Sequence, residues 1–389
     1  MKRSRLAAML LAAPMVLVPA ATGAASAATP EPSAPMVAVQ QAAPGKAVPG
    51  SYIVTLRPGV APQGLTKSTR VQTQYVYSKV FNGFAAKLTP TQLDALRANP
   101  AVRAIEEDQK VTASGTQTGA TWGLDRVDQR NRPLDSSYTW NRDGAGVTAY
   151  IIDTGLDSDH PEFGGRAQNV YNTAGGGNED CHGHGTHVAG TIGGSTYGVA
   201  KGVALRGVKV LGCDGSGSFA GIIAGFDWVR KNAAKPAVAN ASLGGGYSAA
   251  VNTAAANLAN AGVHLSVAAG NDNQDACNYS PASASAVLTV AASDSSDRKA
   301  SFSNYGRCVE TYAPGVSITS ARMGGGSTQM NGTSMASPHA AGVAALYKAN
   351  NGDASSATIN SWITTNATPN VITGNVNSTP NRLLFKADL

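Results

Sequence analysis

The hydrophobic pattern from residue 122 onward alternates between short apolar runs and amphipathic stretches. The apolar runs suit strands that are buried on both faces, and they cover 147–152, 206–211, 237–243, 263–269 and 287–292. Between them, Phe219, Ile222 and Phe226 recur at helical spacing, and a second helix is predicted at 252–261, where Gly262 ends it. This alternation predicts an α/β fold, a mostly parallel sheet flanked by helices on both faces. Reactive side chains in such sheets gather at the carboxyl ends of the strands.

A smaller unit precedes this region. Strand patterns at 51–56, 80–88 and 102–111, with a helix at 89–98, predict a compact α+β domain. Segments poor in charge and rich in Pro, Ala, Gly, Ser or Thr lie on either side of it and are predicted to be linkers. We therefore divide the chain into 1–27, a linker at 28–49, a small domain at 50–112, a second linker at 113–121 and a large domain at 122–389.

The first segment has the composition of a signal peptide. It runs from a basic start at Lys2, Arg3 and Arg5 into an apolar stretch at 6–18 and ends in small residues at 25–27. A membrane anchor is the alternative, but prolines interrupt the stretch and it falls short of the ~20 residues that a span needs. We expect a secreted, extracellular protein with no membrane attachment after processing.

The positive charge of the chain lies mostly outside the large domain. Residues 1–114 hold twelve basic and five acidic residues, a net of +7, whereas residues 115–389 hold eighteen and nineteen, a net of −1. Nucleic acid is therefore not an expected partner.

Four cysteines fall in the large domain, Cys181, Cys213, Cys277 and Cys308. An even number in an exported chain favours two disulfides, and three pairings are possible. Metal ligation is the competing interpretation, but no C-x-x-C pair supports it.

Three residues at predicted element ends carry the chemistry of acyl transfer. Asp153 follows the strand at 147–152, His184 lies in a glycine-rich turn that enters a helix, and Ser334 opens a helix with Pro338 in its first turn. A serine needs an imidazole to take its proton, and a carboxylate holds that imidazole in the right tautomer. Asn271, just past another strand, and the Ser334 backbone N–H are candidate donors to the oxyanion.

Other functions are less consistent with these residues. An α/β-hydrolase esterase has the order Ser, Asp, His, and Ala336 stands where its nucleophile elbow has glycine. An inactive binding protein on a protease scaffold generally lacks a triad residue, and none is missing here. His182, His184 and His187 suggest zinc, but their spacing departs from H-E-x-x-H and its glutamate is absent.

Five separated motifs resemble those of the subtilases, within them the proteinase K-like group. They cover 149–155, 184–190, 242–246, 268–271 and 332–338, and the resemblance extends from Trp122 to the C-terminus. Residues 50–112 resemble the ferredoxin-like inhibitory propeptide of the same family, with 113–121 as the processing region. The resemblance implies a serine endopeptidase that is made as an autoprocessed zymogen, inhibited by its own propeptide, and we expect the mature enzyme to be a monomer.

The resemblance also implies how protein and peptide substrates bind. The substrate would lie as an extended strand between Gly215-Ser216-Gly217 and Ser242-Leu243-Gly244. Small residues at 244–246 and 268–270 would line the first specificity pocket, so we expect broad cleavage after apolar or aromatic residues. Relatives in the group pair the cysteines that correspond to Cys181 with Cys213 and to Cys277 with Cys308.

Calcium is the cofactor that the resemblance implies. One family site corresponds to the carbonyls of Ser285 and Val287 and the carboxylate of Glu310, where the family usually has aspartate. A second site corresponds to four side chains with hard oxygen ligands, Asp125, Asp128, Gln129 and Asp135, with Ser137 in place of an asparagine. His182 likewise stands where the family usually has asparagine.

Overall fold

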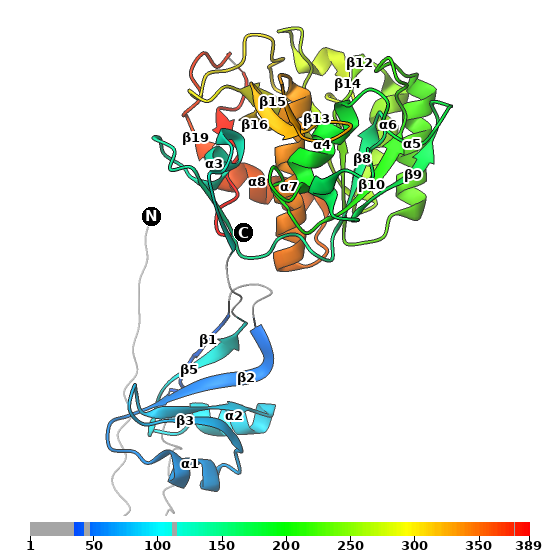
Figure 1. The fold of residues 1–389 in the computed structure, drawn as a ribbon. Coiled ribbons are helices and arrows are strands. Elements are labelled where there is room, and N and C mark those ends of the chain that lie inside the picture. Colours follow the sequence, from blue (N-terminus) through cyan, green and yellow to red (C-terminus); the bar gives the residue numbers. More distant parts are fainter. Residues whose placement is uncertain (1–34, 43–46, 111–114, 377) are drawn as a thin grey trace, which may run out of the picture. The chain divides into compact units, whose positions relative to one another are not determined.

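The structure is a computed structural model of the chain, and it describes residues 35–42, 47–110, 115–376 and 378–389. The segment predicted to be a signal peptide lies outside the described residues. The chain separates into two compact units, 1–40 with 52–106 and 41–51 with 107–389 (Figure 1). None of the helices in the described part is both long and apolar enough to cross a bilayer.

The N-terminal unit is an α+β domain built on a five-stranded sheet with the order β1-β5-β2-β4-β3. Its elements are β1 (Val39–Gln40), β2 (Ala47–Leu56), α1 (Pro62–Ser68), β3 (Thr73–Tyr77), β4 (Gly83–Lys87), α2 (Pro90–Arg97) and β5 (Val102–Gln109). Val54, Phe84, Leu96 and Ile105 pack in its core. The sequence pattern predicted β2, β4, α2 and β5 but missed α1 and β3.

The first predicted linker is partly structured. Strand β1 and the first residues of β2 fall within 28–49 and belong to the five-stranded sheet. A proline-rich composition does not prevent a segment from forming an edge strand or the start of a strand.

Helix α2 is held at its start by a capping box. The Thr89 hydroxyl accepts a hydrogen bond from the Gln92 backbone N–H, and the Gln92 side-chain oxygen accepts one from the Thr89 backbone N–H.

The larger unit is an α/β domain whose elements span the rest of the described chain. They are β6 (Gly115–Thr118), α3 (Trp122–Asp128), β7 (Ser137–Trp140), β8 (Thr148–Asp153), η1 (Pro161–Phe163), β9 (Ala167–Asn172), α4 (His184–Gly193), β10 (Ala204–Lys209), α5 (Phe219–Asn232), β11 (Ala237–Ala241), β12 (Gly245–Gly246), α6 (Ala249–Asn260), β13 (His264–Ala268), η2 (Ala276–Asn278), β14 (Tyr279–Ser280), β15 (Leu288–Ser293), β16 (Thr311–Pro314), β17 (Ile318–Ala321), β18 (Ser327–Met330), α7 (Thr333–Asn351), α8 (Ser356–Asn366), β19 (Thr368–Pro369) and β20 (Arg382–Leu383).

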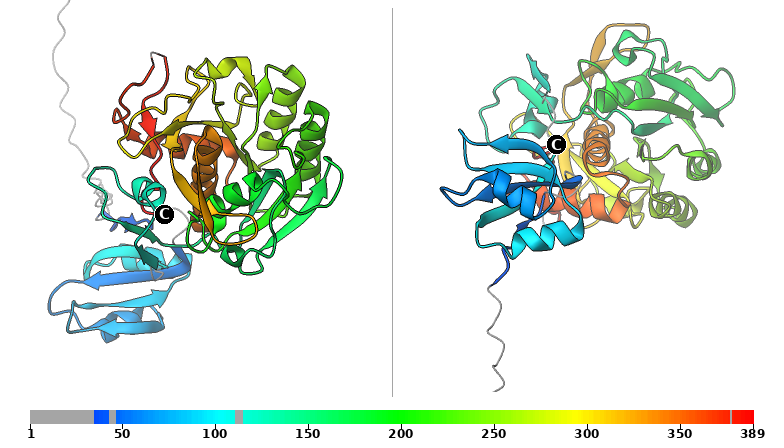
Figure 2. Two further views of the ribbon diagram at one scale, coloured as in Figure 1. Left: turned by 45° about the horizontal axis from the view of Figure 1, so that its top comes forward. Right: turned by 90° about the horizontal axis from the view of Figure 1, so that it is seen from below.

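Nine of these strands form the central sheet, in the order β19-β20-β16-β15-β13-β11-β8-β10-β9. All neighbours pair in parallel except β19 and β20. Strand β8 shows how the sheet is covered, because Ala149 and Ile151 pack in the core that contains α4 and α7, whereas Tyr150 and Ile152 pack in the core that contains α5 and α6. Helices therefore cover both faces, and α7 runs through the middle of the unit (Figure 2). The predicted α/β fold is confirmed.

The second predicted linker also contains a strand. Within 113–121, β6 pairs antiparallel with β7 and places Gly115 opposite Trp140. A side chain at Gly115 would overlap the Trp140 ring, so the glycine that suggested a flexible linker serves close packing of the two strands. Only 113–114 of this linker lie outside the described residues, and 119–121 lead directly into α3.

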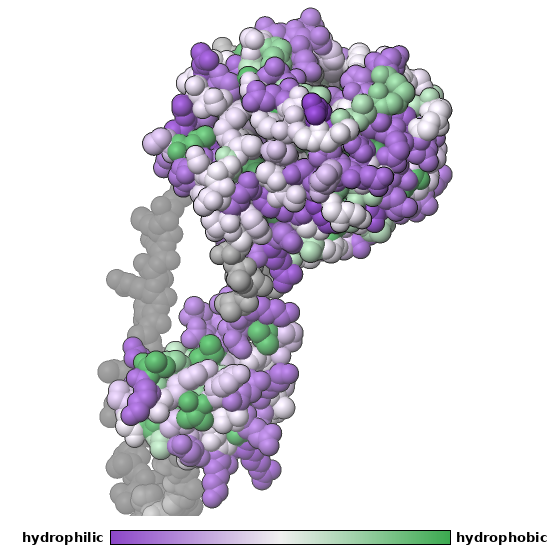
Figure 3. Space-filling view, viewed as in Figure 1, coloured by the Kyte–Doolittle hydropathy of each residue, from purple (hydrophilic) through white to green (hydrophobic). Residues whose placement is uncertain are grey.

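The face of the larger unit that Figure 3 shows is mostly polar, with scattered apolar residues. In the N-terminal unit, four large apolar side chains are exposed on β3 and the loop that follows it, Tyr75, Val76, Val80 and Phe81.

Candidate active site

Three neighbouring parallel strands end at the same edge of the sheet and carry the candidate residues there. Asp153 is the last residue of β8, Ser242 follows β11 directly, and Asn271 follows β13 by three residues. His184 is the first residue of α4 and Ser334 the second of α7. The chain enters both helices through a glycine with positive φ, Gly183 at 99° and Gly332 at 152°, which a residue with a side chain rarely adopts.

Asp153 and His184 are joined by a short hydrogen bond. His184 Nδ1 lies 2.7 Å from Asp153 Oδ1, and the same oxygen accepts the Thr154 backbone N–H at 2.8 Å. The Asp153 side chain is fully buried, whereas that of His184 is one-fifth exposed. Burial alone would lower the pKa of His184, but the charge and hydrogen bond of Asp153, with the charge of Asp180, raise it above its ordinary value.

Asp180 is a second carboxylate beside His184, and the sequence pattern did not single it out. It is buried and accepts the backbone N–H groups of His182, Gly183 and Thr186 at 2.9 to 3.0 Å. Burial raises the pKa of Asp180, but these N–H groups and the Thr186 hydroxyl lower it by more, so the pKa is below its ordinary range. The carboxylate thereby satisfies free N–H groups at the start of α4 and holds the turn that presents His184. An acidic residue just before a helix start was the available signal.

Ser334 lies in the first turn of α7, where backbone N–H groups have no partner inside the helix. Its hydroxyl donates a hydrogen bond of 3.3 Å to the Ser242 carbonyl. The hydrogen bonds of the described residues do not include one between Ser334 and His184. Catalytic hydrogen bonds are often long without substrate and tighten when it binds.

Asn271 is held by its amide oxygen. Its Oδ1 accepts the Thr333 backbone N–H at 2.8 Å and the Thr333 hydroxyl at 2.9 Å. Because the oxygen end of the amide is occupied, its N–H₂ end is available to a ligand. The side chain lines a cavity of about 250 Å³ together with Ser334. Thr333 thus orients the Asn271 amide. The sequence analysis did not single it out, although its place next to Ser334 was a usable signal.

Two cavities lie beside these residues and share Leu243, Gly244 and Gly245 in their walls. The one of about 250 Å³ is walled by small residues at 244–245 and 268–270, as the predicted specificity pocket requires. The other, of about 530 Å³, is lined by His184 and by both predicted substrate segments, Gly215, Ser216 and Gly217 on one side and Ser242, Leu243 and Gly244 on the other. The structure thus brings together every residue predicted to bind the substrate backbone.

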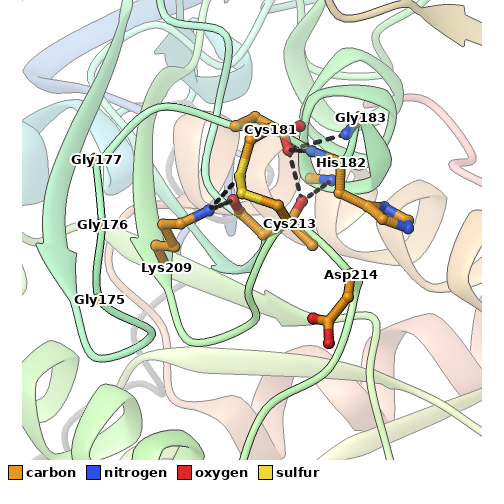
Figure 4. The surroundings of a disulfide bond; sticks show 12 residues. Gly175, Gly176, Gly177, Cys181, His182, Gly183, Lys209, Cys213 and Asp214 are labelled. Carbon is orange, nitrogen blue, oxygen red and sulfur yellow. Dashed lines mark hydrogen bonds between the residues drawn. A yellow bond between two sulfur atoms is a disulfide. The ribbon is translucent and has the colours of Figure 1, made fainter.

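The cysteines form two disulfides, Cys181–Cys213 and Cys277–Cys308. This is the pairing that the resemblance implies. The first joins the loop before His184 to the loop that carries Gly215, so it connects the predicted base to a predicted substrate segment (Figure 4). Behind it, the buried Lys209 ammonium donates to the Thr154 carbonyl at 2.5 Å and contacts Cys181 Sγ at 3.5 Å.

The three clustered histidines have different roles. His187 is buried, its Nε2 lies 2.9 Å from the Ile318 carbonyl oxygen, and burial lowers its pKa to about 4. It is a packed residue of α4 and not a partner of His184. His182 is exposed and lines the larger cavity, with its ring centroid 6.3 Å from that of His184. A zinc site that uses all three would require His184 to leave Asp153 and His187 to leave the core.

Glu310 has the environment of a cation ligand. Desolvation of its carboxylate raises its pKa to about 7, although the Thr289 backbone N–H donates to Oε2 at 2.6 Å. The ion pairs of the described residues do not include one with Glu310. The charge of Arg382 lowers the pKa of Glu310 only in part. A partly buried carboxylate with no ion pair fits the hard-oxygen site that the resemblance implies with Ser285 and Val287.

The second predicted calcium set fits only in part. Asp125 is buried, and its Oδ1 has no hydrogen-bond partner among the described residues, which suits a ligand for a cation. Gln129 Oε1 and Asp135 Oδ1 accept only local donors. Asp128 is instead paired with the Lys386 ammonium at 2.9 Å, so it would have to give up this ion pair to bind calcium.

Comparison with known proteins agrees with this geometry. The model of the Subtilase family matches residues 144–384, and that of the peptidase inhibitor I9 family matches 51–114. An extracellular serine proteinase of a Thermus species is 48% identical over 369 residues, 87% of this chain and 90% of the relative. Proteinase R of Parengyodontium album is 46% identical over 321 residues, 80% of this chain and 81% of the relative.

A solved structure, that of a cold adapted subtilisin-like serine proteinase, is also similar. It is 50% identical, has a TM-score of 0.68, and the match covers 69% of this chain and 99% of the other. The two family models match the two units of the chain in the order that the sequence analysis expected. The chain therefore belongs to the subtilase family of serine endopeptidases and carries an I9 propeptide domain ahead of the catalytic domain.

Proposed function

We propose that this chain is the precursor of a secreted serine endopeptidase whose catalytic triad is Asp153, His184 and Ser334. The observation that carries the proposal is the 2.7 Å hydrogen bond between His184 Nδ1 and Asp153 Oδ1, at the sheet edge where Ser334 opens α7. This bond leaves His184 Nε2 as the nitrogen that faces the substrate side, so it is the one that can take the Ser334 proton.

Each residue then has one role in peptide hydrolysis. His184 Nε2 takes the proton of Ser334 Oγ as the oxygen attacks the scissile carbonyl, and Asp153 stabilises the imidazolium. The Ser334 backbone N–H and Asn271 Nδ2 donate to the tetrahedral oxyanion, which also lies at the positive end of α7. His184 returns the proton to the leaving amine. Water then attacks the acyl-enzyme while His184 takes its proton, and His184 returns that proton to Ser334 Oγ as the acid product leaves.

The shape of the smaller cavity supports broad specificity. Six of its thirteen lining residues are glycine or alanine, which leaves room for a large apolar or aromatic side chain on the acyl side of the scissile bond, and Leu243 and Tyr279 add apolar surface to the wall. The two segments of the larger cavity can pair with the substrate backbone, which is indifferent to side chains. We expect a library of peptides to be cleaved best after Phe, Tyr, Leu and Met. A strict requirement for Lys or Arg at this position would contradict the proposal.

The pKa of His184 predicts the acid limb of the pH profile. The imidazole must be neutral to act as a base, and it is protonated below its pKa. Because Asp153 and Asp180 raise this pKa above 6.5, kcat/KM should begin to fall at a pH above 6.5 as the solution is acidified. In D153N the fall of kcat/KM on acidification should move to lower pH. The kcat/KM at the pH optimum should be about 10⁴-fold lower, because the His184 tautomer is no longer fixed. An unmoved limb would exclude His184 as the base.

The N-terminal unit is proposed to inhibit the enzyme until it is cut off. The match to the peptidase inhibitor I9 family at 51–114 supports a domain that inhibits a protease. Strand β6 belongs to the larger unit and pairs with β7, so we place the cleavage before Gly115, which keeps this strand in the mature enzyme. The Thermus relative is named an extracellular serine proteinase, which supports secretion of this chain.

Calcium is proposed as a structural ligand at Glu310 with the Ser285 and Val287 carbonyls, and at Asp125 with Gln129 and Asp135. Bound calcium would supply positive charge to the carboxylates of Glu310 and Asp125, which burial desolvates. When chelator removes the calcium, the pKa of the Glu310 carboxyl is about 7 in the folded state, against 4.5 in an unfolded chain. The folded state therefore binds this proton more tightly than the unfolded state does. Its contribution to stability is therefore present at low pH and is lost as the pH rises from 4.5 to about 7, by up to about 3 kcal/mol.

The measurement is the melting temperature in the S334A background, which cannot digest itself. We expect chelator to lower the melting temperature at neutral pH, calcium to restore it and magnesium to have no effect. E310Q should remove the decline between pH 4.5 and 7 in chelator and weaken the response to calcium. A melting temperature that ignores both chelator and calcium would remove the metal from the proposal.

A further inference from the structure

Pro338 lies inside α7 and not in its first turn, where the sequence pattern placed it. The helix begins at Thr333, so Pro338 is its sixth residue. In an α-helix, the N–H of residue 338 would donate to the carbonyl of residue 334, four positions earlier. Proline has no N–H. The carbonyl of Ser334, the proposed nucleophile, therefore lacks its partner within the helix.

A side chain from another element takes the place of that missing donor. Ser242 Oγ donates to the Ser334 carbonyl at 2.7 Å, while the Ser334 hydroxyl donates to the Ser242 carbonyl at 3.3 Å. Ser242 is only 3% exposed, so its hydroxyl makes the bond to the Ser334 carbonyl away from bulk water. Ser242 thus contacts the nucleophile residue twice, once through its side chain and once through its backbone.

The Ser242 hydroxyl is itself oriented by a buried chain of hydrogen bonds. Asn240 Nδ2 donates to Ser242 Oγ at 2.9 Å, and Asn240 Oδ1 accepts from Ser337 Oγ at 2.7 Å. Ser337 Oγ lies 2.8 Å from Ser266 Oγ in β13. Asn240, Ser266 and Ser337 are completely buried. Because Asn240 gives its N–H to Ser242, the Ser242 hydroxyl must use its own proton on the Ser334 carbonyl.

Buried polar groups are costly unless each one is satisfied, and this chain satisfies them between two strands and one turn of α7. The members come from β11 and the residue after it, from β13, and from the turn between Ser334 and Pro338. The network therefore fixes the first turn of α7 relative to the sheet edge where Asp153 and Asn271 lie.

We propose that Ser242, oriented by Asn240, is a positioning residue that holds the nucleophile in place by donating to the Ser334 carbonyl, which Pro338 leaves without a helical donor. This inference rests on the proposed function, since it takes Ser334 as the nucleophile. Ser242 serves through its hydroxyl here, in addition to the backbone contact with substrate that the family resemblance implies for it.

The test is a double-mutant cycle between S242A and P338A in the full chain. S242A removes the donor, and P338A restores an N–H that can make the regular helical bond to the same carbonyl. The control is S356A, because Ser356 is also buried and its hydroxyl also donates to a backbone carbonyl, that of Ala259 at 2.9 Å, but at the start of α8 away from the site. Active sites are counted with a serine-directed phosphonylating reagent, and kcat and KM are measured on a peptide substrate.

We expect S242A to lower kcat by about 10- to 100-fold with KM changed by less than about twofold, the loss typical of a misplaced reacting group. The kcat of P338A alone should stay within about threefold of that of the parent. The double variant should recover most of the kcat that S242A loses, which is a clear departure from additivity. S356A should lower the melting temperature and leave kcat unchanged.

A double variant whose losses simply multiply, or an S242A enzyme with full kcat, would overturn the proposal. If S242A does not accumulate in folded form, N240A gives the same readout, because it leaves the Ser242 hydroxyl in place but free to turn. N240A with unchanged kcat would also overturn it. Failure of the proposed function is distinguishable, since it would appear as proteolysis by S334A, which this cycle does not involve.

Discussion

Ser334→Ala should abolish proteolysis and leave the precursor intact. Without the hydroxyl no acyl-enzyme can form, and the expected loss in kcat is about 10⁶-fold, the magnitude measured when subtilisin, a member of this family, loses its nucleophile. Because the cut before Gly115 is proposed to be made by the chain itself, the variant should retain its N-terminal unit. Mass spectrometry and N-terminal sequencing of the secreted protein measure both effects.

A matched control for this variant is Ser361→Ala on the exposed face of α8. It also replaces a helical serine by alanine, and it should mature and cleave peptides as the parent does. If S334A matures normally and hydrolyses peptides, the triad assignment is wrong. If it loses hydrolysis but still appears without its N-terminal unit, another protease makes the cut, and only autoprocessing is withdrawn.

Asn271→Ala should lower kcat by roughly 10²- to 10³-fold with little change in KM. The magnitude is again one measured in subtilisin, for its own oxyanion-hole asparagine, and is carried over here. The effect falls on kcat because the amide donates to charge that exists only in the transition state. Steady-state kinetics on a peptide ester and a peptide amide measure it, with active sites counted by titration.

Thr333→Val tests why Asn271 is oriented as it is. Asn271 Oδ1 would keep the bond to the Thr333 backbone N–H but lose the bond to the hydroxyl. We expect a smaller loss of kcat, about tenfold, since a looser amide is still a donor. Thr333→Ser should restore it. A T333V loss equal to that of N271A would contradict the claim that a looser amide still donates, and an N271A enzyme with unchanged kcat would remove Asn271 from the oxyanion site.

Much of the fold could be predicted because the central strands are buried on both faces. Their apolar runs, as at 147–152 and 263–269, match β8 and β13 to within a residue or two at each end. Elements that depend on pairing partners were missed. Strand β6 is a short polar stretch, and only β7 opposite it stabilises the strand. Strand β3 lies at the sheet edge and exposes Tyr75 and Val76, so no buried face marks it in the sequence.

The reactive residues of the candidate site could be proposed from the sequence, because each reaction step needs a particular residue type. Asp153, His184 and Asn271 could be placed from strand ends and family motifs, and the structure brings Asp153 and His184 into contact. The supporting residues were not singled out. The role of Asp180 is local, because it acts on the N-terminus of α4 three to six residues further along, and its place before a helix start was an available signal. The positioning role of Ser242 could not be predicted, because it arises from a contact between distant segments. Ser242 acts on the carbonyl that Pro338 leaves free, 92 residues away in the chain.

Covalent labelling tests the central claim most directly. A phosphonylating reagent that reacts with activated serines is incubated with the mature enzyme, and the modified residue is located by peptide mass spectrometry. The account predicts one adduct per molecule, on Ser334, and none on the H184A variant, which keeps the serine but lacks the base that activates it. An adduct on a different serine, or equal labelling of H184A, would contradict the assignment of Asp153, His184 and Ser334 as the catalytic triad.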